Sequence, residues 1–282
     1  MGKITIGYIF SERGLGEDER AFLEVAKKKN IDLVMINTSH DWDKETLQEK
    51  VKPCKILYNN CGENFSLEIT KMIEEYGKKI IDSSKNFYYD EEKWMFFLKC
   101  QKHKIPVPKT ILLSANIPLA KKELKNFNCW PVVLKRVEGT MAEYVEKAEN
   151  LREAEKIINH FWKKGSERLP IIAQEFIKSQ NYRVTVIGDK IVQTALKKSN
   201  RWKTIGNCAE NFKKFKVDKE LKVIINKIIK FFGIKVCGID LLKKNRKWLV
   251  LEVNSIPAFD FFPNKRKELV GKVLDFLKKE SR

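Results

Sequence analysis

Val236-Cys237-Gly238-Ile239-Asp240-Leu241-Leu242 and Trp248-Leu249-Val250-Leu251-Glu252-Val253-Asn254 are two apolar runs near the end of this 282-residue chain, separated by a short basic segment. Runs of this length, rich in Val, Ile and Leu, are typical of buried strands. The link between them contains only Lys, Asn and Arg, which favours a turn. The pattern therefore predicts an antiparallel hairpin.

Two acidic residues interrupt these apolar runs. Asp240 and Glu252 lie where burial should exclude them, since an unpaired carboxylate in apolar surroundings is costly. Together with Asn254 they offer only oxygen ligands, the set that a hard ion such as Mg²⁺ accepts beside phosphate oxygens. The alternative is structural: each carboxylate pairs with Lys or Arg from a neighbouring element.

The same residues carry a family resemblance. The segments Gly238-Ile239-Asp240-Leu241-Leu242 and Leu251-Glu252-Val253-Asn254-Ser255-Ile256-Pro257 resemble the end of the catalytic domain in ATP-grasp ligases of the RimK-like and LysX-like branch. The resemblance implies that Asp240, Glu252 and Asn254 hold the Mg²⁺ ions that bridge the ATP phosphates, with Mn²⁺ as an alternative ion.

The order of elements predicts an α/β fold. Strands alternate with helices over the first 81 residues, which indicates a small parallel sheet. The resemblance adds a catalytic part of α+β character, the ATP-grasp fold, whose two subdomains clasp ATP. We expect a Rossmann-like domain at 1–90, a central subdomain at 91–170 and a C-terminal subdomain with the metal site at 171–282. No G-x-G-x-x-G fingerprint follows the first strand, which argues against a nicotinamide enzyme.

Two lysines are candidate phosphate ligands. Lys93 begins a helix that ends before Ile105-Pro106-Val107-Pro108-Lys109-Thr110, an element that cannot continue a helix. Lys135 ends the apolar strand Trp130–Lys135, where a cation needs an anion opposite it. In the resembled family both lysines contact ATP phosphate. The alternative for Lys93 is a solvated helix residue.

The loop after Lys135 departs from the family pattern. The resemblance calls for a glycine-rich loop over the phosphates, but Val137–Glu143 contains a single glycine, Gly139. One glycine gives less of the positive-φ freedom that close phosphate approach uses. We therefore expect a weaker phosphate lid, and a non-catalytic nucleotide-binding relative stays open as an alternative.

The remaining candidate site residues lie in the expected C-terminal subdomain. By resemblance, the Gln174-Glu175-Phe176-Ile177 segment is the hinge that binds adenine. Arg183, in Asn181-Tyr182-Arg183-Val184, is a candidate catalytic residue. Lys203 stands in a basic loop where the family has Arg; it keeps the charge but lacks the bidentate fork.

Composition narrows the cellular setting and the partners. The formal net charge is +19, but the lysines are spread over the whole chain, without a basic tail or a nucleic-acid-binding signature. Nucleic acid is therefore an unlikely partner, although a basic nucleic-acid-binding protein is the second alternative. No apolar run is long enough to span a bilayer and no signal peptide is recognisable, so we expect a cytoplasmic protein that does not bind membranes.

The function implied by the resemblance is ATP- and Mg²⁺-dependent carboxylate–amine ligation through an acyl-phosphate. The amine would belong to an amino acid such as glutamate. The carboxylate would belong to a small molecule, a peptide or an acidic carrier protein, since the strongly basic chain favours acidic partners. A homo-oligomer is compatible with the sequence.

Overall fold

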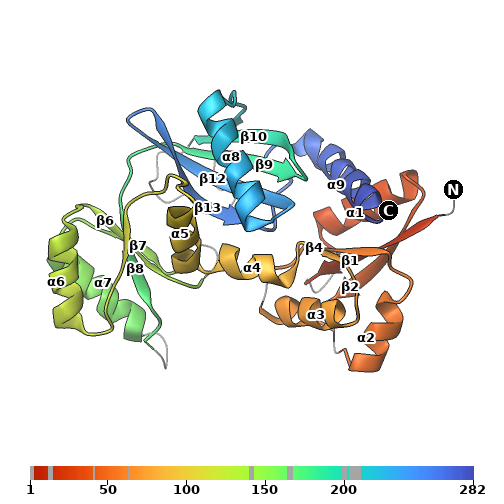
Figure 1. Cartoon of the computed structure of the whole chain (residues 1–282), viewed down its shortest axis with the longest axis horizontal. Helices are drawn as coiled ribbons and strands as arrows, with labels where there is room; N and C mark the ends of the chain where they lie inside the picture. Colours follow the sequence, from red (N-terminus) through yellow and green to blue (C-terminus); the bar gives the residue numbers. More distant parts are fainter. Residues whose placement is uncertain are drawn as a thin grey trace.

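Three sheets build the molecule, which is a computed structural model describing residues 3–11, 15–40, 42–62, 64–139, 143–163, 168–198, 202 and 211–282. Figure 1 shows the N-terminal sheet at one end, a second sheet at the other, and a third sheet with its covering helix between and above them. The predicted α/β class, with a parallel sheet followed by antiparallel ones, is confirmed.

The N-terminal sheet is parallel, with the strand order β2-β1-β3-β4. Its strands are almost continuously apolar because helices cover them, as expected for a parallel sheet. The elements are β1 (Ile4–Phe10), α1 (Glu17–Lys28), β2 (Ile31–Asn37), α2 (Lys44–Val51), β3 (Ile56–Asn59), α3 (Asn64–Glu75) and β4 (Ile80–Ile81).

The central sheet is antiparallel, with the order β5-β8-β6-β7. Two amphipathic helices pack on this sheet and share its hydrophobic core. The elements are β5 (Thr110–Leu112), α6 (Ile117–Phe127), β6 (Val132–Arg136), β7 (Val145–Ala148), α7 (Leu151–Lys163) and β8 (Ile171–Glu175). Strand β8 begins the predicted C-terminal subdomain (171–282), and it pairs with β5 and β6 in the central sheet.

The third sheet is antiparallel and has the order β11-β10-β9-β12-β13. The predicted C-terminal hairpin is confirmed as β12 and β13. The core of this sheet also takes residues from the two helices packed against it. The elements are β9 (Asn181–Ile187), β10 (Lys190–Lys198), β11 (Asn211–Lys213), α8 (Lys219–Phe232), β12 (Val236–Lys244) and β13 (Lys247–Asn254), together with α4 (Ser84–Glu91) and α5 (Lys93–Lys102) from earlier in the chain.

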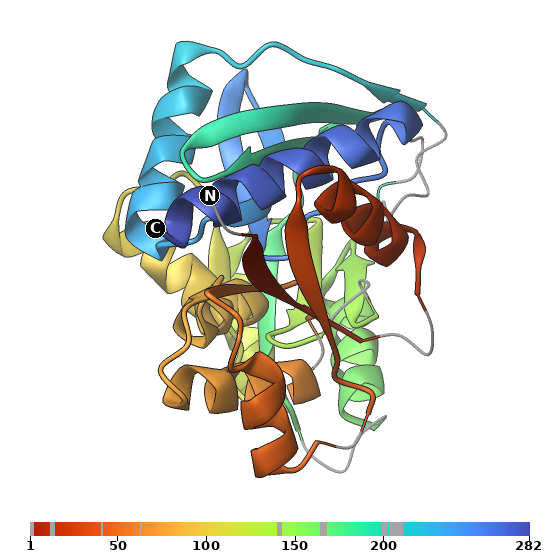
Figure 2. The same ribbon diagram turned by 90° about the vertical axis from the view of Figure 1, so that its right-hand side faces the viewer.

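The last helix returns to the first sheet. After the short turn η1 (Pro263–Lys265), α9 (Arg266–Glu280) lies beside α1, as Figure 2 shows. Its apolar side chains, among them Leu269, Val273 and Leu277, are buried with Phe22 of α1 in the N-terminal core. The two ends of the chain therefore share one hydrophobic core, which fixes the third sheet relative to the first.

Candidate active site

Neighbouring strands of the third sheet bring the predicted acidic and basic residues side by side. Asp240 on β12 lies opposite Glu252 on β13 and opposite Arg183 on β9. Directly opposed residues of antiparallel strands point to the same face. One face of the sheet therefore carries a row of Arg183, Asp240 and Glu252, with Asn254 two residues beyond Glu252.

The Asp240 carboxylate is only partly satisfied by protein groups. Its Oδ2 accepts hydrogen bonds from Arg183 Nη1 at 3.3 Å and from Asn254 Nδ2 at 3.4 Å. Its Oδ1 is buried and has no hydrogen-bond partner among the described residues. The ion pair with Arg183 agrees with the structural alternative for Asp240, but the second oxygen remains available to a ligand.

Glu252 adds a second carboxylate beside the first. Burial, and after it the negative charge of Asp240, raise the pKa of Glu252, while Lys135 and Arg183 act in the opposite direction. Two adjacent carboxylates with an orphaned oxygen and an amide neighbour form an all-oxygen donor set, which fits a hard divalent cation. Among the described residues, no three or more His, Cys, Asp and Glu side chains form a cluster. The candidate metal ligands here are therefore two carboxylates and one amide.

A glycine makes room for Arg183. A Cβ at position 238 would collide with the guanidinium of Arg183, which lies over the backbone of β12. The guanidinium carbon also lies 5.6 Å from the centre of the Phe261 ring. Arg183 Nε is buried and has no hydrogen-bond partner in the described part of the chain. Arg183 therefore has both a fixed position and an unused donor.

Lys197 is a residue of this face that the sequence analysis did not single out. It is 6% exposed, lies opposite Asn181 in the register of β10 and β9, and places its Nζ 5.4 Å from the centre of the same Phe261 ring. Strand alternation puts Asn181 on the same face as Arg183. Its burial on this face depends on the pairing of β10 with β9, which the sequence of β10 alone does not contain.

Lys135 faces the row from the central sheet. Its Nζ donates to Gln174 Oε1 at 2.8 Å, and Gln174 Nε2 donates to Thr110 Oγ1 at 3.0 Å. Burial lowers the pKa of Lys135 to about 8, although the Glu252 carboxylate raises it, and Lys93 lowers it further. The two sheets thus bring together the predicted phosphate lysine and the predicted metal ligands.

Lys93 is hydrogen-bonded to the loop that follows β6. Its Nζ donates to the Gly139 carbonyl at 2.9 Å, and its backbone N–H donates to the Val137 carbonyl at 3.0 Å. Gly139 has a φ of +133°, a conformation that favours glycine. Lys93 is therefore bound to the single-glycine loop. The next residues of the loop, 140–142, lie outside the described part.

The predicted hinge consists of the last two residues of β8, Gln174 and Glu175, and the two residues that follow, Phe176 and Ile177. The Phe176 N–H donates to the Pro131 carbonyl at 3.1 Å, and Ile177 is buried. The Glu175 carboxylate accepts from the Lys109 N–H at 2.9 Å and pairs with Lys244. These groups are already bonded within the protein, and the hinge connects the central sheet to the third sheet. The other predicted catalytic residue, Lys203, lies outside the described residues.

Comparison with known proteins identifies the family of this chain. The RimK-like ATP-grasp domain matches residues 90–277. The chain belongs to the RimK-like ATP-grasp family. A protein named probable alpha-L-glutamate ligase from Coxiella burnetii is 31% identical over 158 residues, 54% of this chain and 52% of that relative. The chain therefore matches about half the length of this curated relative.

Solved ATP-grasp structures share the fold over nearly the whole chain. A RimK domain protein from Sphaerobacter thermophilus superposes with a TM-score of 0.78 at 15% identity, covering 97% of this chain and 99% of that protein. D-alanine–D-alanine ligase from Bacillus anthracis, solved with ATP, gives a TM-score of 0.73 at 16% identity, with 99% and 97% covered. Similarity at this identity shows the ATP-grasp fold.

Proposed function

We propose that this chain is an ATP- and Mg²⁺-dependent carboxylate–amine ligase that works through an acyl-phosphate. The observation that carries the proposal is the meeting of Lys135, from the central sheet, with the Arg183–Asp240–Glu252 row of the third sheet. Cations and an acidic oxygen set on facing elements are what a metal-bound polyphosphate requires. Family membership supports this assignment, and the name of the Coxiella relative supports glutamate as the amine.

The substrates react in two steps. A carboxylate oxygen of the acceptor attacks the γ-phosphorus of ATP, the bond from that phosphorus to the β,γ-bridging oxygen breaks, and ADP leaves. The amine nitrogen then attacks the acyl carbon, the bond from that carbon to the phosphate oxygen breaks, and phosphate leaves as the amine loses a proton. The products are an amide, ADP and phosphate.

The protein acts by positioning and by charge neutralisation. Lys135 neutralises phosphate charge from a fixed place, since Gln174 and Thr110 hold its Nζ. Arg183 offers its free Nε to an oxyanion near Asp240. Lys93 holds Gly139 by its carbonyl, and Lys203 is proposed as a further cation of the substrate site.

The metal and the nucleotide have their own proposed contacts. Asp240, Glu252 and Asn254 would hold Mg²⁺, which supplies charge neutralisation for the phosphates when bound. Gln174, Glu175, Phe176 and Ile177 would line the adenine. Because the Phe176 N–H is already bonded to Pro131, the base would use the Phe176 carbonyl and the Ile177 N–H.

Phosphate release tests this function. With ATP and Mg²⁺, we expect release only when a carboxylate acceptor and an amine are both present, with one ADP formed per amide. The panel would include glutamate as the amine, and acidic peptides and small carboxylates as acceptors. ATP binding without release for any pair would instead support the non-catalytic nucleotide-binding relative that the single-glycine loop suggested.

A further inference from the structure

The segment between β13 and η1 places one aromatic ring against two cations of the candidate active site. The ring belongs to Phe261, which is 3% exposed. The guanidinium carbon of Arg183 and the Nζ of Lys197 lie 5.6 Å and 5.4 Å from its centre. Both distances are within the ~6 Å over which an aromatic face attracts a cation. Phe261 therefore contacts both basic side chains of this face of the third sheet.

The two cations are close enough to repel each other. In the pairing of β10 with β9, Lys197 is two residues beyond Ala195, the residue opposite Arg183. Diagonal neighbours of this kind are about 7–8 Å apart on one face of a sheet. Arg183 reaches Asp240 at 3.3 Å, whereas no carboxylate of the described residues pairs with Lys197. Because Lys197 is buried, the ring supplies the electrostatic partner that the ammonium lacks.

Packing on other residues fixes the ring. Phe261 contacts Phe212, which lies opposite Lys197 on β11, with 5.0 Å between the two ring centres. Two residues earlier, Phe259 is fully buried in the N-terminal core, where its ring centre lies 6.2 Å from that of Phe22. The orientation of the Phe261 ring is thus set by apolar contacts on two sides of the segment.

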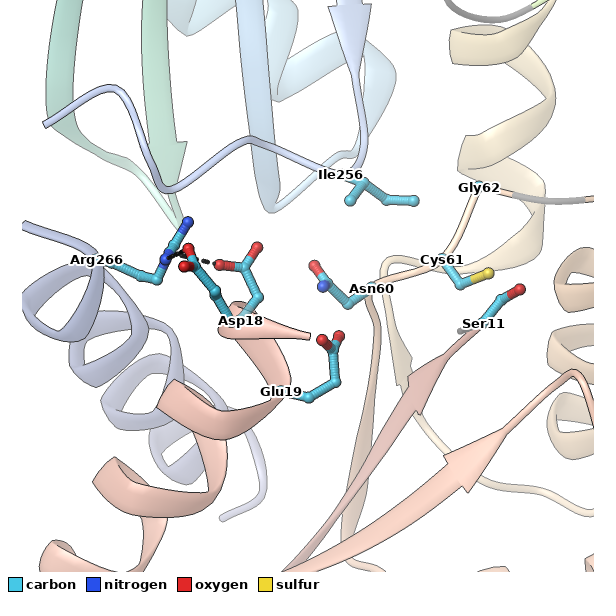
Figure 3. Close-up of a pocket in the computed structure, with 9 residues that line it drawn as sticks. Ser11, Asp18, Glu19, Asn60, Cys61, Gly62, Ile256 and Arg266 are labelled. Carbon is cyan, nitrogen blue, oxygen red and sulfur yellow. Dashed lines mark hydrogen bonds and ion pairs between the residues drawn. The ribbon is translucent and has the colours of Figure 1, made fainter. Parts of the chain in front are cut away.

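Ion pairs at the start of α9 fasten the same segment. Figure 3 shows the Arg266 side chain beside Asp18 of α1. Arg266 pairs with Glu17, and its Nε lies 2.8 Å from Asp18 Oδ1. Its Nη2 also lies 4.0 Å from Oδ2 of Asp260, the residue before Phe261. The segment that carries the ring is therefore attached to α1 and α9, independently of the two cations that the ring contacts.

We propose that Phe261 is a positioning residue of the ligase, whose ring holds Arg183 and Lys197 together as a paired cation site for an oxyanion of the acyl-phosphate. The inference rests on the proposed function and adds a residue that acts through the two cations. A neutral ring attracts both cations and leaves their charge to the substrate, whereas a carboxylate in its place would neutralise them. Arg183 Nε, which is buried without a hydrogen-bond partner in the described residues, remains available to the oxyanion.

Fluorination of the ring tests the inference at nearly constant shape. Fluorine withdraws electrons from the ring face, so phenylalanines with one, two and three ring fluorines at position 261 should weaken the cation contacts stepwise. We expect kcat for phosphate release to fall by about tenfold across the series, the scale of a desolvated cation–π contact. The KM for ATP should stay the same, because the packing of the segment is retained.

A binding measurement separates this inference from the ligase function. Calorimetry with inorganic phosphate, in the presence of ADP and Mg²⁺, reports on the oxyanion site without turnover. Phosphate affinity should fall along the same fluorinated series. In a Lys197→Met background the effect of the fluorines should be smaller, because one of the two cations that the ring contacts is gone.

Phe259 provides a matched control. It is a buried phenylalanine of the same segment, and no cation of the described residues lies over its ring. The same fluorinated residues at position 259 should leave kcat and phosphate affinity as they were. Phosphate that does not bind, or values that stay constant along the series at 261 or change equally at 259, would overturn the inference. Phosphate affinity that falls along the series, in a chain that releases no phosphate with any substrate pair, would uphold it while contradicting the proposed ligase function.

Discussion

Lys135 is the residue whose charge the surroundings control most directly, since burial opposes its proton and Glu252 favours it. With a pKa of about 8 in the free protein, it is mostly protonated at pH 7 and loses the proton as the pH rises through 8. ATP needs the protonated form, so binding above pH 8 must first restore the proton. We expect ATP affinity to fall by at most about tenfold per pH unit above pH 8, measured by calorimetry between pH 7 and 9.

Two variants at this position serve as controls. Lys135→Arg stays charged over the whole range, so its ATP affinity should not follow the same slope. Lys135→Met keeps the apolar stem without the charge, and it should bind ATP weakly at every pH. A slope that persists in Lys135→Met would assign the pH dependence to another group.

At the residue scale, the sequence indicated the site through charged residues in apolar strands. Asp240, Glu252 and Lys135 stood out because each interrupts an apolar strand, and the structure brings these three together. Lys197 and the fit of Arg183 over Gly238 were not predicted. They depend on which residues lie opposite each other in neighbouring strands, and a single strand's sequence does not contain that register.

At the scale of elements, α8 shows most clearly how single residues define the two ends of a helix. Its N-cap residue, Asp218, accepts a hydrogen bond from the Leu221 N–H at 2.8 Å, and its C-cap residue, Gly233, has a φ of +72°. Asp218 Oδ2 also accepts from Trp248 Nε1 at 2.8 Å, which ties the helix to β13. Asp218→Ala should therefore lower the free energy of unfolding by about 1–2 kcal/mol, measured by urea denaturation. Glu220→Ala, an exposed change in the same turn, should cost much less, and equal losses would contradict the capping role.

Elements whose partners are distant were harder to predict. The pairing of β8 with β5 and β6, and the packing of α9 on the first sheet, join residues far apart in the chain. Short apolar runs and amphipathic helices show which face is buried, but not against which element. The central helices α6 and α7 were not singled out, although their apolar periodicity is regular.

At the scale of the whole molecule, the net charge of +19 makes a prediction about the acceptor. If the reacting carboxylate belongs to an acidic polypeptide, its KM should rise steeply from low to moderate salt, because surface charges beyond about 10 Å are screened near 0.1 M. The KM for ATP should change less, since partly buried groups would hold its phosphates. Kinetics of phosphate release over a salt series would measure both, and equal sensitivity would count against a macromolecular acceptor.

The candidate active site is formed by segments that lie far apart in the chain. Within the described residues, the central sheet contributes Lys135, the third sheet contributes the acidic row, and α9 joins the third sheet to the first through a shared core. Among the described residues, no helix has both the length and the apolar composition needed to span a bilayer.

The most direct test of the central claim is the rate of phosphate release by Asp240→Asn and Glu252→Gln. If these carboxylates hold the metal and its nucleotide, each change should lower turnover by about a hundredfold or more. The melting temperature should hold or rise, since one of two adjacent, partly buried carboxylates is removed. Asp32→Asn, an exposed change on the first sheet, should alter neither quantity. Turnover that stays unchanged in both Asp240→Asn and Glu252→Gln would contradict the account and leave the pair with Arg183 as a structural ion pair.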